Sequence, residues 1–200
     1  MTRYSAGTAA MLLAAAVASA ADWSSPFDGK TLNGWKAEGK AAWSVEKGEL
    51  VGRQGPGGAG GDLFSVQQWR DFELEAEWTM RFPGNSGIWF RVTGPGTGYQ
   101  SDILDQSSNP GVLSGSLYCM GKAFIAENRD ASTVKRDGWN RIRIRATGDE
   151  LVIVQNGKEV VRVHDGTFPG AGSIGIQVHA GKEFEGMEVR IRNLRVRILD

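Results

Sequence analysis

Apolar and polar residues alternate along much of the chain with a period of two, and no stretch keeps a helical period. The clearest run sets apolar positions against intervening glutamates: Phe72, Leu74, Ala76, Trp78 and Met80 against Glu73, Glu75 and Glu77. Successive side chains of a strand point to opposite faces. The run therefore predicts a strand with one buried face and one solvated, acidic face.

Similar alternation recurs towards the end of the chain. Ile142 and Ile144 alternate with arginines, and two β-branched runs flank Asn156-Gly157. Asn-Gly between such runs predicts a tight hairpin, because both residues tolerate positive φ. Further alternation covers residues 174–178 and 189–198. Strands spaced about 8–12 residues apart with glycine-rich turns predict an all-β fold, an antiparallel sandwich or barrel.

The charged residues between the apolar positions have two interpretations. Glu73, Glu75 and Glu77 on one strand and Arg141, Arg143 and Arg145 on another favour cross-strand ion pairs on a solvated sheet face. A cluster of catalytic carboxylates is the alternative, which the regular alternation with core residues disfavours.

The first twenty residues resemble a secretory signal. Arg3 gives a positive start, residues 11–17 are apolar, and Ala18-Ser19-Ala20 offers a cleavage site before Ala21. A membrane span needs about 20 apolar residues, more than this stretch provides. We therefore expect residues 1–20 to be removed and residues 21–200 to form one periplasmic or secreted domain, with no membrane span.

Composition narrows the choice of partners. Without Arg3 the chain has 22 basic and 23 acidic residues (23 − 1 against 23), so a nucleic-acid partner is not expected. The single cysteine, Cys119, permits no internal disulfide, and the fold must depend on its apolar core. Residues 52–61 are rich in glycine but lack the context of a phosphate-binding loop, and predict a mobile surface loop at a cleft.

Three segments place polar residues on one face of a predicted strand. Around residue 89 the outward face holds Trp89 and Arg91. The outward faces of the other two segments pair Gln100 with Asp102 and Gln177 with His179. If these faces meet, an aromatic ring, amides, a guanidinium and a carboxylate suit a sugar, which has apolar C–H faces and many hydroxyls. His164 receives no role.

Short motifs along nearly the whole domain resemble the 3-keto-disaccharide hydrolase family. They include PFDGKTLNGW at residues 26–35, WSVEKGELVG at 43–52, GDLF at 61–64, NSGI at 85–88, YQSD at 99–102, GSLY at 115–118 and RNLR at 192–195. The resemblance implies a concanavalin-like jelly roll and an exported enzyme that cleaves glycosides whose sugar carries a C3 ketone. Two departures from the family pattern are Gln100 with Asp102 after the tyrosine and Arg190 near the end.

The resemblance also implies roles for the candidate residues. Asp102 and His179 would transfer protons, Arg91, Gln100 and Gln177 would hold hydroxyls or the enolate oxygen, and Trp89 and Tyr118 would form aromatic walls. A divalent metal on Asp102 and His179 is consistent with the resemblance, although no ligand spacing indicates one.

Two other functions remain open. The first is a carbohydrate-binding, lectin-like module without turnover. The second is a conventional glycosidase, which needs two carboxyl groups about 5–9 Å apart. The Glu-x-Asp-x-x-Glu pattern of such enzymes is missing from the sequence.

Overall fold

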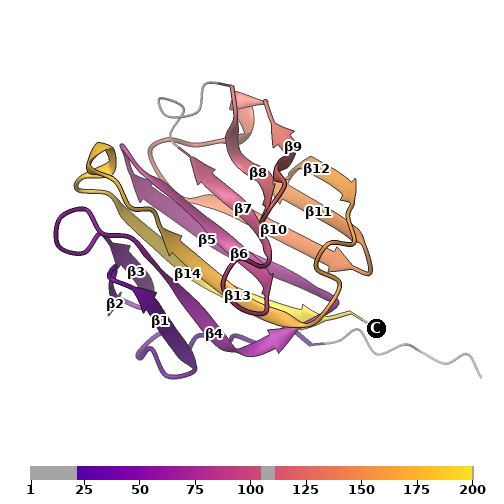
Figure 1. The fold of residues 1–200 in the computed structure, drawn as a ribbon, viewed down its shortest axis with the longest axis horizontal. Helices are drawn as coiled ribbons and strands as arrows, with labels where there is room; N and C mark the ends of the chain where they lie inside the picture. Colours follow the sequence, from indigo (N-terminus) through magenta and orange to yellow (C-terminus); the bar gives the residue numbers. More distant parts are fainter. Residues whose placement is uncertain (1–21, 105–110, 200) are drawn as a thin grey trace, which may run out of the picture.

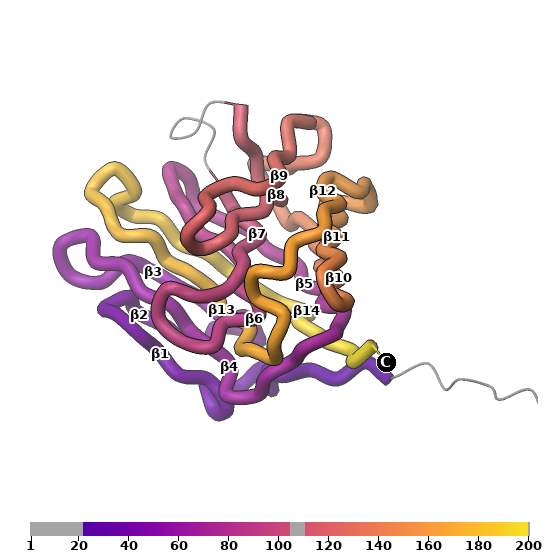
Figure 2. The backbone as a smooth tube through the Cα atoms, turned by 45° about the vertical axis from the view of Figure 1, so that its right-hand side comes forward, coloured from indigo at the N-terminus to yellow at the C-terminus, as the bar shows by residue number. Residues whose placement is uncertain are grey.

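The computed structural model describes residues 22–104 and 111–199, which form two seven-stranded antiparallel sheets packed face to face (Figures 1 and 2). The first sheet runs β1 (Trp35–Gly39), β4 (Gly61–Trp69), β13 (Gly172–Val178), β6 (Asn85–Val92), β7 (Tyr99–Leu104), β8 (Leu113–Cys119) and β9 (Ala123–Asn128). The second runs β12 (Lys158–His164), β11 (Glu150–Gln155), β10 (Asn140–Thr147), β5 (Phe72–Arg81), β14 (Glu188–Ile198), β3 (Glu49–Arg53) and β2 (Ala42–Glu46). The predicted all-β antiparallel sandwich is confirmed.

The core lies between the sheets and follows the predicted alternation. Phe72, Leu74 and Trp78 from β5 are fully buried against Ile88 and Phe90 from β6. Burying a large apolar side chain contributes about 1.5–3 kcal/mol, so this shared core fixes which face of each strand points inward. The predicted hairpin at Asn156-Gly157 joins β11 to β12, with φ of 48° and 86°.

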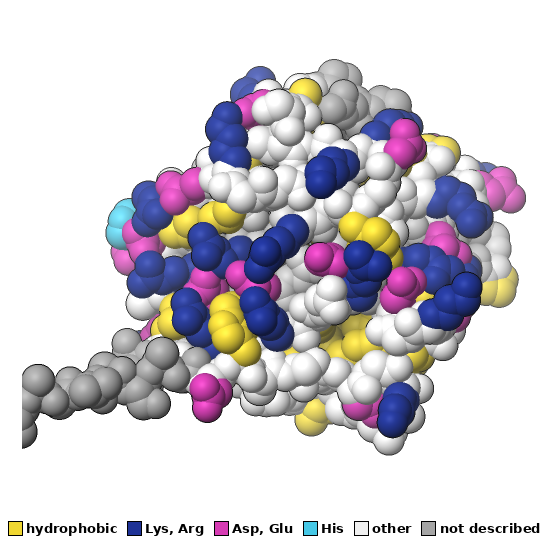
Figure 3. All heavy atoms as spheres, turned by 180° about the vertical axis from the view of Figure 1, so that it is seen from behind, with side chains coloured by type: hydrophobic (Ala, Val, Ile, Leu, Met, Phe, Trp, Pro, Cys, Tyr) yellow, Lys and Arg dark blue, Asp and Glu magenta, His cyan; other side chains and the backbone are white. Residues whose placement is uncertain are grey.

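The outer face of the second sheet carries the ion-pair ladder (Figure 3). Glu73 bonds to Arg143 and Arg197, and Glu75 to Arg141 and Arg195. Glu73 is only 5% exposed because arginine side chains cover it, although it lies on the outer face. Opposite charges on neighbouring strands stabilise the sheet modestly, as the sequence predicted.

Two 3-10 turns, η1 (Ala131–Thr133) and η2 (Lys182–Phe184), are the helical elements among the described residues. No helix there has the length and apolar character to cross a membrane. The predicted signal, residues 1–20, lies outside the described residues.

Candidate active site

The outer face of the first sheet carries two rows of side chains that cross its strands. One, the polar row, consists of residues paired across β4, β13, β6 and β7: Asp62, Gln177, Gly87 and Asp102. The aromatic row lies two residues further along each strand and consists of Phe64, Gly175, Trp89, Gln100, Tyr118 and Phe124. Two residues of strand span about 7 Å, so both rows can line one site.

A cavity of about 450 Å³ lies over these rows, within the range of small-molecule sites. We call it the catalytic cavity, because it holds the residues to which the sequence analysis assigned catalysis. Six of the seven predicted site residues line it: Trp89, Gln100, Asp102, Tyr118, Gln177 and His179. The rest of its lining is Asp62, Asn85, Leu104, Met120 and Phe124. Strand alternation thus brings together residues from four separate segments.

Asp102 is the most deeply buried acid of the cavity, at 5% exposure. Burial raises the pKa of its carboxyl well above the usual value. No ion pair to Asp102 is found in residues 22–104 and 111–199. Its partner is the Gln100 amide, oriented so that Nε2 donates to Asp102 Oδ1 at 2.5 Å. An acid held this way is a stronger base, once ionised, than an ordinary aspartate.

Gly87 makes room for Gln100. It pairs with Asp102 across β6 and β7, and a Cβ at Gly87 would lie 2.5 Å from Cδ and Cγ of Gln100. The side chain of Gln100 therefore lies across the Gly87 backbone and reaches Asp102. Only glycine allows this arrangement without displacing the amide.

Trp89 presents a hydrogen-bonded edge to the cavity. Its Nε1 donates to Asp62 Oδ1 at 2.8 Å, and the Gln100 oxygen accepts from the same group at 3.1 Å. A hydrogen-bonded chain thus joins Asp62, Trp89, Gln100 and Asp102. Burial is the main reason that the pKa of Asp62 is raised, and the Trp89 hydrogen bond opposes the shift.

His179 follows β13 directly and is exposed at the cavity rim. Its Nδ1 lies 2.5 Å from the Ala180 carbonyl oxygen, which can only accept, so Nδ1 carries a proton. In the neutral ring Nε2 then carries the lone pair. The ring packs edge-on against Phe184 with centroids 5.4 Å apart.

The glycine-rich segment of residues 52–61 lies behind His179. Gln54 Nε2 donates to the carbonyl oxygens of His179 and Gly181, at 3.0 and 2.8 Å. A Cβ at Gly60 would lie 2.5 Å from Val178 O and Ala180 N. The predicted mobile loop is therefore better described as a hydrogen-bonded support, and its glycines allow close packing.

Arg91 does not join the site, contrary to the sequence prediction. Its φ of 54° interrupts the strand alternation, and the side chain is fully buried at the end of the sandwich. There it donates to Arg70 O at 2.9 Å, Gly148 O at 2.7 Å and Asp71 Oδ1 at 3.1 Å. Its role is to tie three segments together.

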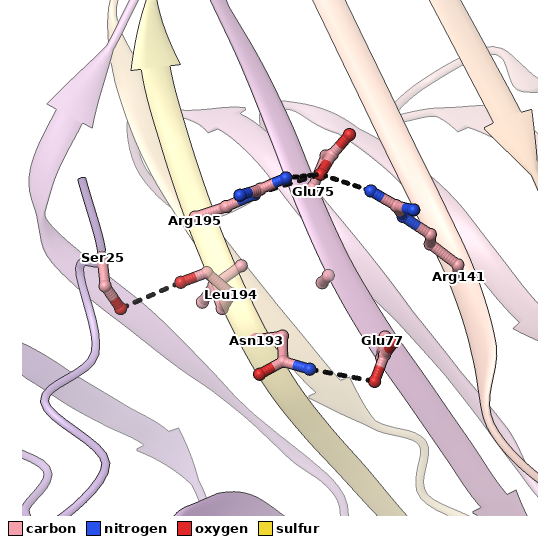
Figure 4. Close-up of a pocket in the computed structure, with 8 residues that line it drawn as sticks. Ser25, Glu75, Glu77, Arg141, Asn193, Leu194 and Arg195 are labelled. Atoms are coloured by element: carbon pink, nitrogen blue, oxygen red, sulfur yellow. Dashed lines mark hydrogen bonds and ion pairs between the residues drawn. The ribbon is translucent and has the colours of Figure 1, made fainter. Parts of the chain in front are cut away.

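Another cavity, of about 520 Å³, lies on the outer face of the second sheet beside the bulge at Asn193 (Figure 4). Its polar groups bond to one another: Glu75 to Arg141 and Arg195, and Glu77 to Asn193. These groups belong to the ion-pair ladder and already have hydrogen-bond partners. The cavity on the first sheet is therefore the better candidate for a ligand site.

The residues of the catalytic cavity do not fit a resident divalent metal. Among the described residues, no group of three His, Cys, Asp or Glu side chains could hold a metal ion. Asp102 and His179 are two ligands at most, and Asp102 Oδ1 accepts from Gln100.

Sequence reasoning missed Asp62, Asn85 and Phe124. The run Asp62-Leu63-Phe64 carried a usable signal, because burying Leu63 places Asp62 and Phe64 together on the outer face. Nothing in the local sequence indicated which face of β9 would bring Phe124 to the cavity.

The two sequence comparisons identify one family. Residues 22–197 match the sequence profile of the 3-keto-alpha-glucoside-1,2-lyase-like domain. A 3-keto-disaccharide hydrolase of Bacteroides thetaiotaomicron is 28% identical, with 87% of this chain and 77% of that protein covered.

Solved structures support the jelly-roll class. A candidate glycosyl hydrolase from Parabacteroides distasonis has a TM-score of 0.67 at 20% identity and covers 89% of this chain and 94% of its own. The carbohydrate-binding module CBM66 from Bacillus subtilis has a TM-score of 0.63 at 20% identity, with 82% and 95% covered.

Proposed function

Because this chain belongs to the family of 3-keto-alpha-glucoside-1,2-lyase-like domains, we propose that it cleaves glycosides whose sugar carries a ketone at C3. The observation that carries the proposal is Asp102, a buried carboxyl without an ion-pair partner in the described chain, in a cavity that also holds an imidazole. A structural carboxyl would be expected to pair with a cation. A general base must be able to accept a proton, and Asp102 can do so because no cation pairs with its carboxylate in the described chain.

The C3 ketone acidifies the hydrogen on C2, so elimination can replace direct displacement. Asp102 takes the C2 proton to give an enolate whose charge lies on the C3 oxygen. Collapse of the enolate then restores the C3 ketone, forms the C1=C2 bond and breaks the C1–O bond. His179, in its imidazolium form, gives the Nε2 proton to the departing oxygen and returns to the neutral ring with its proton on Nδ1. Water then adds its hydroxyl to C1 and a proton to C2, which completes a net hydrolysis. Asn85 and Gln177 supply amide donors for the enolate oxygen and the hydroxyls.

Gln100 has a positioning role in this scheme. Its nitrogen is used by Asp102 and its oxygen by Trp89. It therefore holds the base in place, whereas the sequence assigned it to substrate hydroxyls. Tyr118 packs edge-on against Trp89, with centroids 6.4 Å apart, and both limit water access to the base. Export by the segment of residues 1–20 belongs to the same proposal.

A lectin-like module without turnover is the second candidate. The aromatic row and the amides of Asn85 and Gln177 suit sugar binding whether or not a reaction follows. The two functions separate on rate: a module of this kind would bind 3-keto-glycosides and release no product.

We expect turnover of 3-keto-glycosides to fall on acidification at a higher pH than an ordinary aspartate base would give. The raised pKa of Asp102 means that its carboxyl takes up a proton earlier as the pH falls, and a protonated base is inactive. An unperturbed aspartate titrates near about 3.9. The measurement is kcat/KM against pH on 3-keto-glucosides. Binding with no turnover at any pH would overturn the enzymatic proposal.

Gly87→Ala should lower kcat about 10–100-fold and change KM little, because the new methyl displaces Gln100 and so misplaces the base. Gly166→Ala is the matched control, since a Cβ there meets no atom within 4 Å and its φ is not left-handed. Wild-type kcat in Gly87→Ala would show that Gln100 does not position Asp102.

A further inference from the structure

A second chamber of about 470 Å³ adjoins the catalytic cavity on the same face of the first sheet. Asp62, Trp89 and Met120 line both, so the two spaces are neighbours across these residues. We call it the apolar chamber, because its walls are formed mainly by Phe64, Val66, Val92, Pro95 and Met120. Its position beside the reacting groups makes it the natural place for the other half of a substrate.

The floor and rim of the apolar chamber are built by specific residues. A Cβ at Gly175 would lie 2.3 Å from Phe64 Cδ1, so the Phe64 ring occupies the space that this glycine leaves open. Val66 is 71% exposed, one of two large exposed apolar side chains among the described residues. Apolar area left open beside a polar site is typical of a binding surface.

The loop of residues 93–98 forms a fixed wall. Thr97 Oγ1 accepts from the backbone N–H groups of Thr93 and Gly94, both at 3.0 Å, and donates to Gly94 O at 2.7 Å. Met120 N donates to Gly98 O at 3.1 Å, which anchors the loop to the next hairpin. The chamber therefore exists before any ligand arrives.

Most polar groups around the apolar chamber already have partners. Lys36 pairs with Glu38, the Ser65 hydroxyl donates to Gln67 O, and Thr93 donates to Thr97. Of the described residues at this chamber, Gln68 and Ser173 alone keep side chains without a hydrogen bond. The catalytic cavity keeps more free groups, because the Asn85 amide, the Tyr118 hydroxyl and His179 Nε2 have no side-chain hydrogen bond to another cavity residue in the described chain.

We infer that the apolar chamber holds the leaving group, and that the substrates are 3-keto-glycosides of apolar, ring-bearing alcohols rather than disaccharides. The inference rests on the proposed function. The 3-keto sugar lies in the catalytic cavity, where its hydroxyls find free partners, and the glycosidic oxygen lies near the Trp89–Asp62 junction. A second sugar in the apolar chamber would leave most of its hydroxyls unpaired, which costs binding free energy. An apolar ring would gain by leaving water.

The test compares 2-phenylethyl and ethyl 3-keto-glucosides of one anomeric configuration. Both release a primary alcohol of similar basicity, so the chemical step is matched and the ring is the difference. We expect kcat/KM to be about 10–100-fold higher for the phenylethyl compound. Val66→Asp should remove most of this preference by lowering kcat/KM for the phenylethyl compound. Ile198→Asp, at the other large exposed apolar residue, is the control and should preserve it.

Binding separates failure of this inference from failure of the proposed function. The same two ligands are titrated calorimetrically into Asp102→Asn protein, in which turnover is blocked. Tighter binding of the phenylethyl compound that Val66→Asp abolishes supports the inference, even if the wild type turns over neither ligand. Equal affinities, or a preference that survives Val66→Asp, overturn it. Tighter binding of a 3-keto-disaccharide than of the phenylethyl compound overturns it as well.

Discussion

Asp102→Asn should abolish turnover of 3-keto-glycosides and leave their binding within a few-fold of wild type. Asparagine keeps the shape of the side chain and an oxygen that accepts from Gln100, but it cannot take the C2 proton. Loss of a general base typically costs about 10²–10⁴-fold, or roughly 3–5 kcal/mol of barrier. Initial rates of product release measure turnover, and calorimetric titration measures the binding affinity.

The same substitution should stabilise the folded protein at neutral pH. Folding raises the pKa of Asp102, so as the pH rises this carboxyl ionises in the unfolded chain before it ionises in the folded protein. Ionisation stabilises the unfolded chain first, and the free energy of unfolding therefore falls. Asparagine removes this penalty, so the difference between variant and wild type should grow from acid to neutral pH. Urea denaturation at several pH values would show it.

Glu75→Gln is the matched control for Asp102→Asn, because it makes the same chemical change on the other sheet. Glu75 bonds to Arg141 and Arg195, both on the outer ladder. Its loss should cost little stability, because the two arginines that pair with it are 61% and 45% exposed, and it should leave kcat/KM unchanged. Full activity in Asp102→Asn, or lost activity in Glu75→Gln, would show that the proposal assigns the reaction to the wrong sheet.

Alternation was sufficient to predict most of the fold and the outer-face position of most candidate site residues. A period of two fixes which side chains share a face, and a two-sided sandwich has one inner face for each sheet. Trp89, Gln100, Asp102 and Gln177 could therefore be assigned to outer faces without knowing the strand order. Their convergence then followed because β13, β6 and β7 are neighbours in the first sheet.

The errors occurred where the backbone leaves the regular strand. Arg91 has a left-handed φ that is uncommon for a residue with a Cβ, and counting by twos cannot anticipate it. The bulge between Arg192 and Arg195 shifts the alternation of β14 in the same way, from Ile191 to Leu194. The contacts of Gln100 with Asp102 and Trp89 could not be anticipated either, because they depend on the space left by Gly87 of the neighbouring strand.

The corrected position of Arg91 predicts a loss of stability. Arg91→Met keeps the length of the aliphatic stem but leaves the carbonyl oxygens of Arg70 and Gly148 without their buried donor. It also leaves the Asp71 carboxylate without its guanidinium partner. Removing one partner of a buried charged network costs about 3–5 kcal/mol. At this size each kcal/mol shifts Tm by about 2–4 °C, so thermal and urea denaturation should both show it clearly.

Arg141→Met provides the comparison for Arg91→Met, since Arg141 is 61% exposed and pairs with Glu75 on the outer ladder. Its cost should stay below about 1 kcal/mol. The Arg91 guanidinium lies away from the catalytic cavity, so folded Arg91→Met protein should bind 3-keto-glycosides with near wild-type affinity at low temperature. A variant with wild-type stability and lost binding would instead return Arg91 to the site. That result would mean that the guanidinium turns towards the sugar when substrate binds.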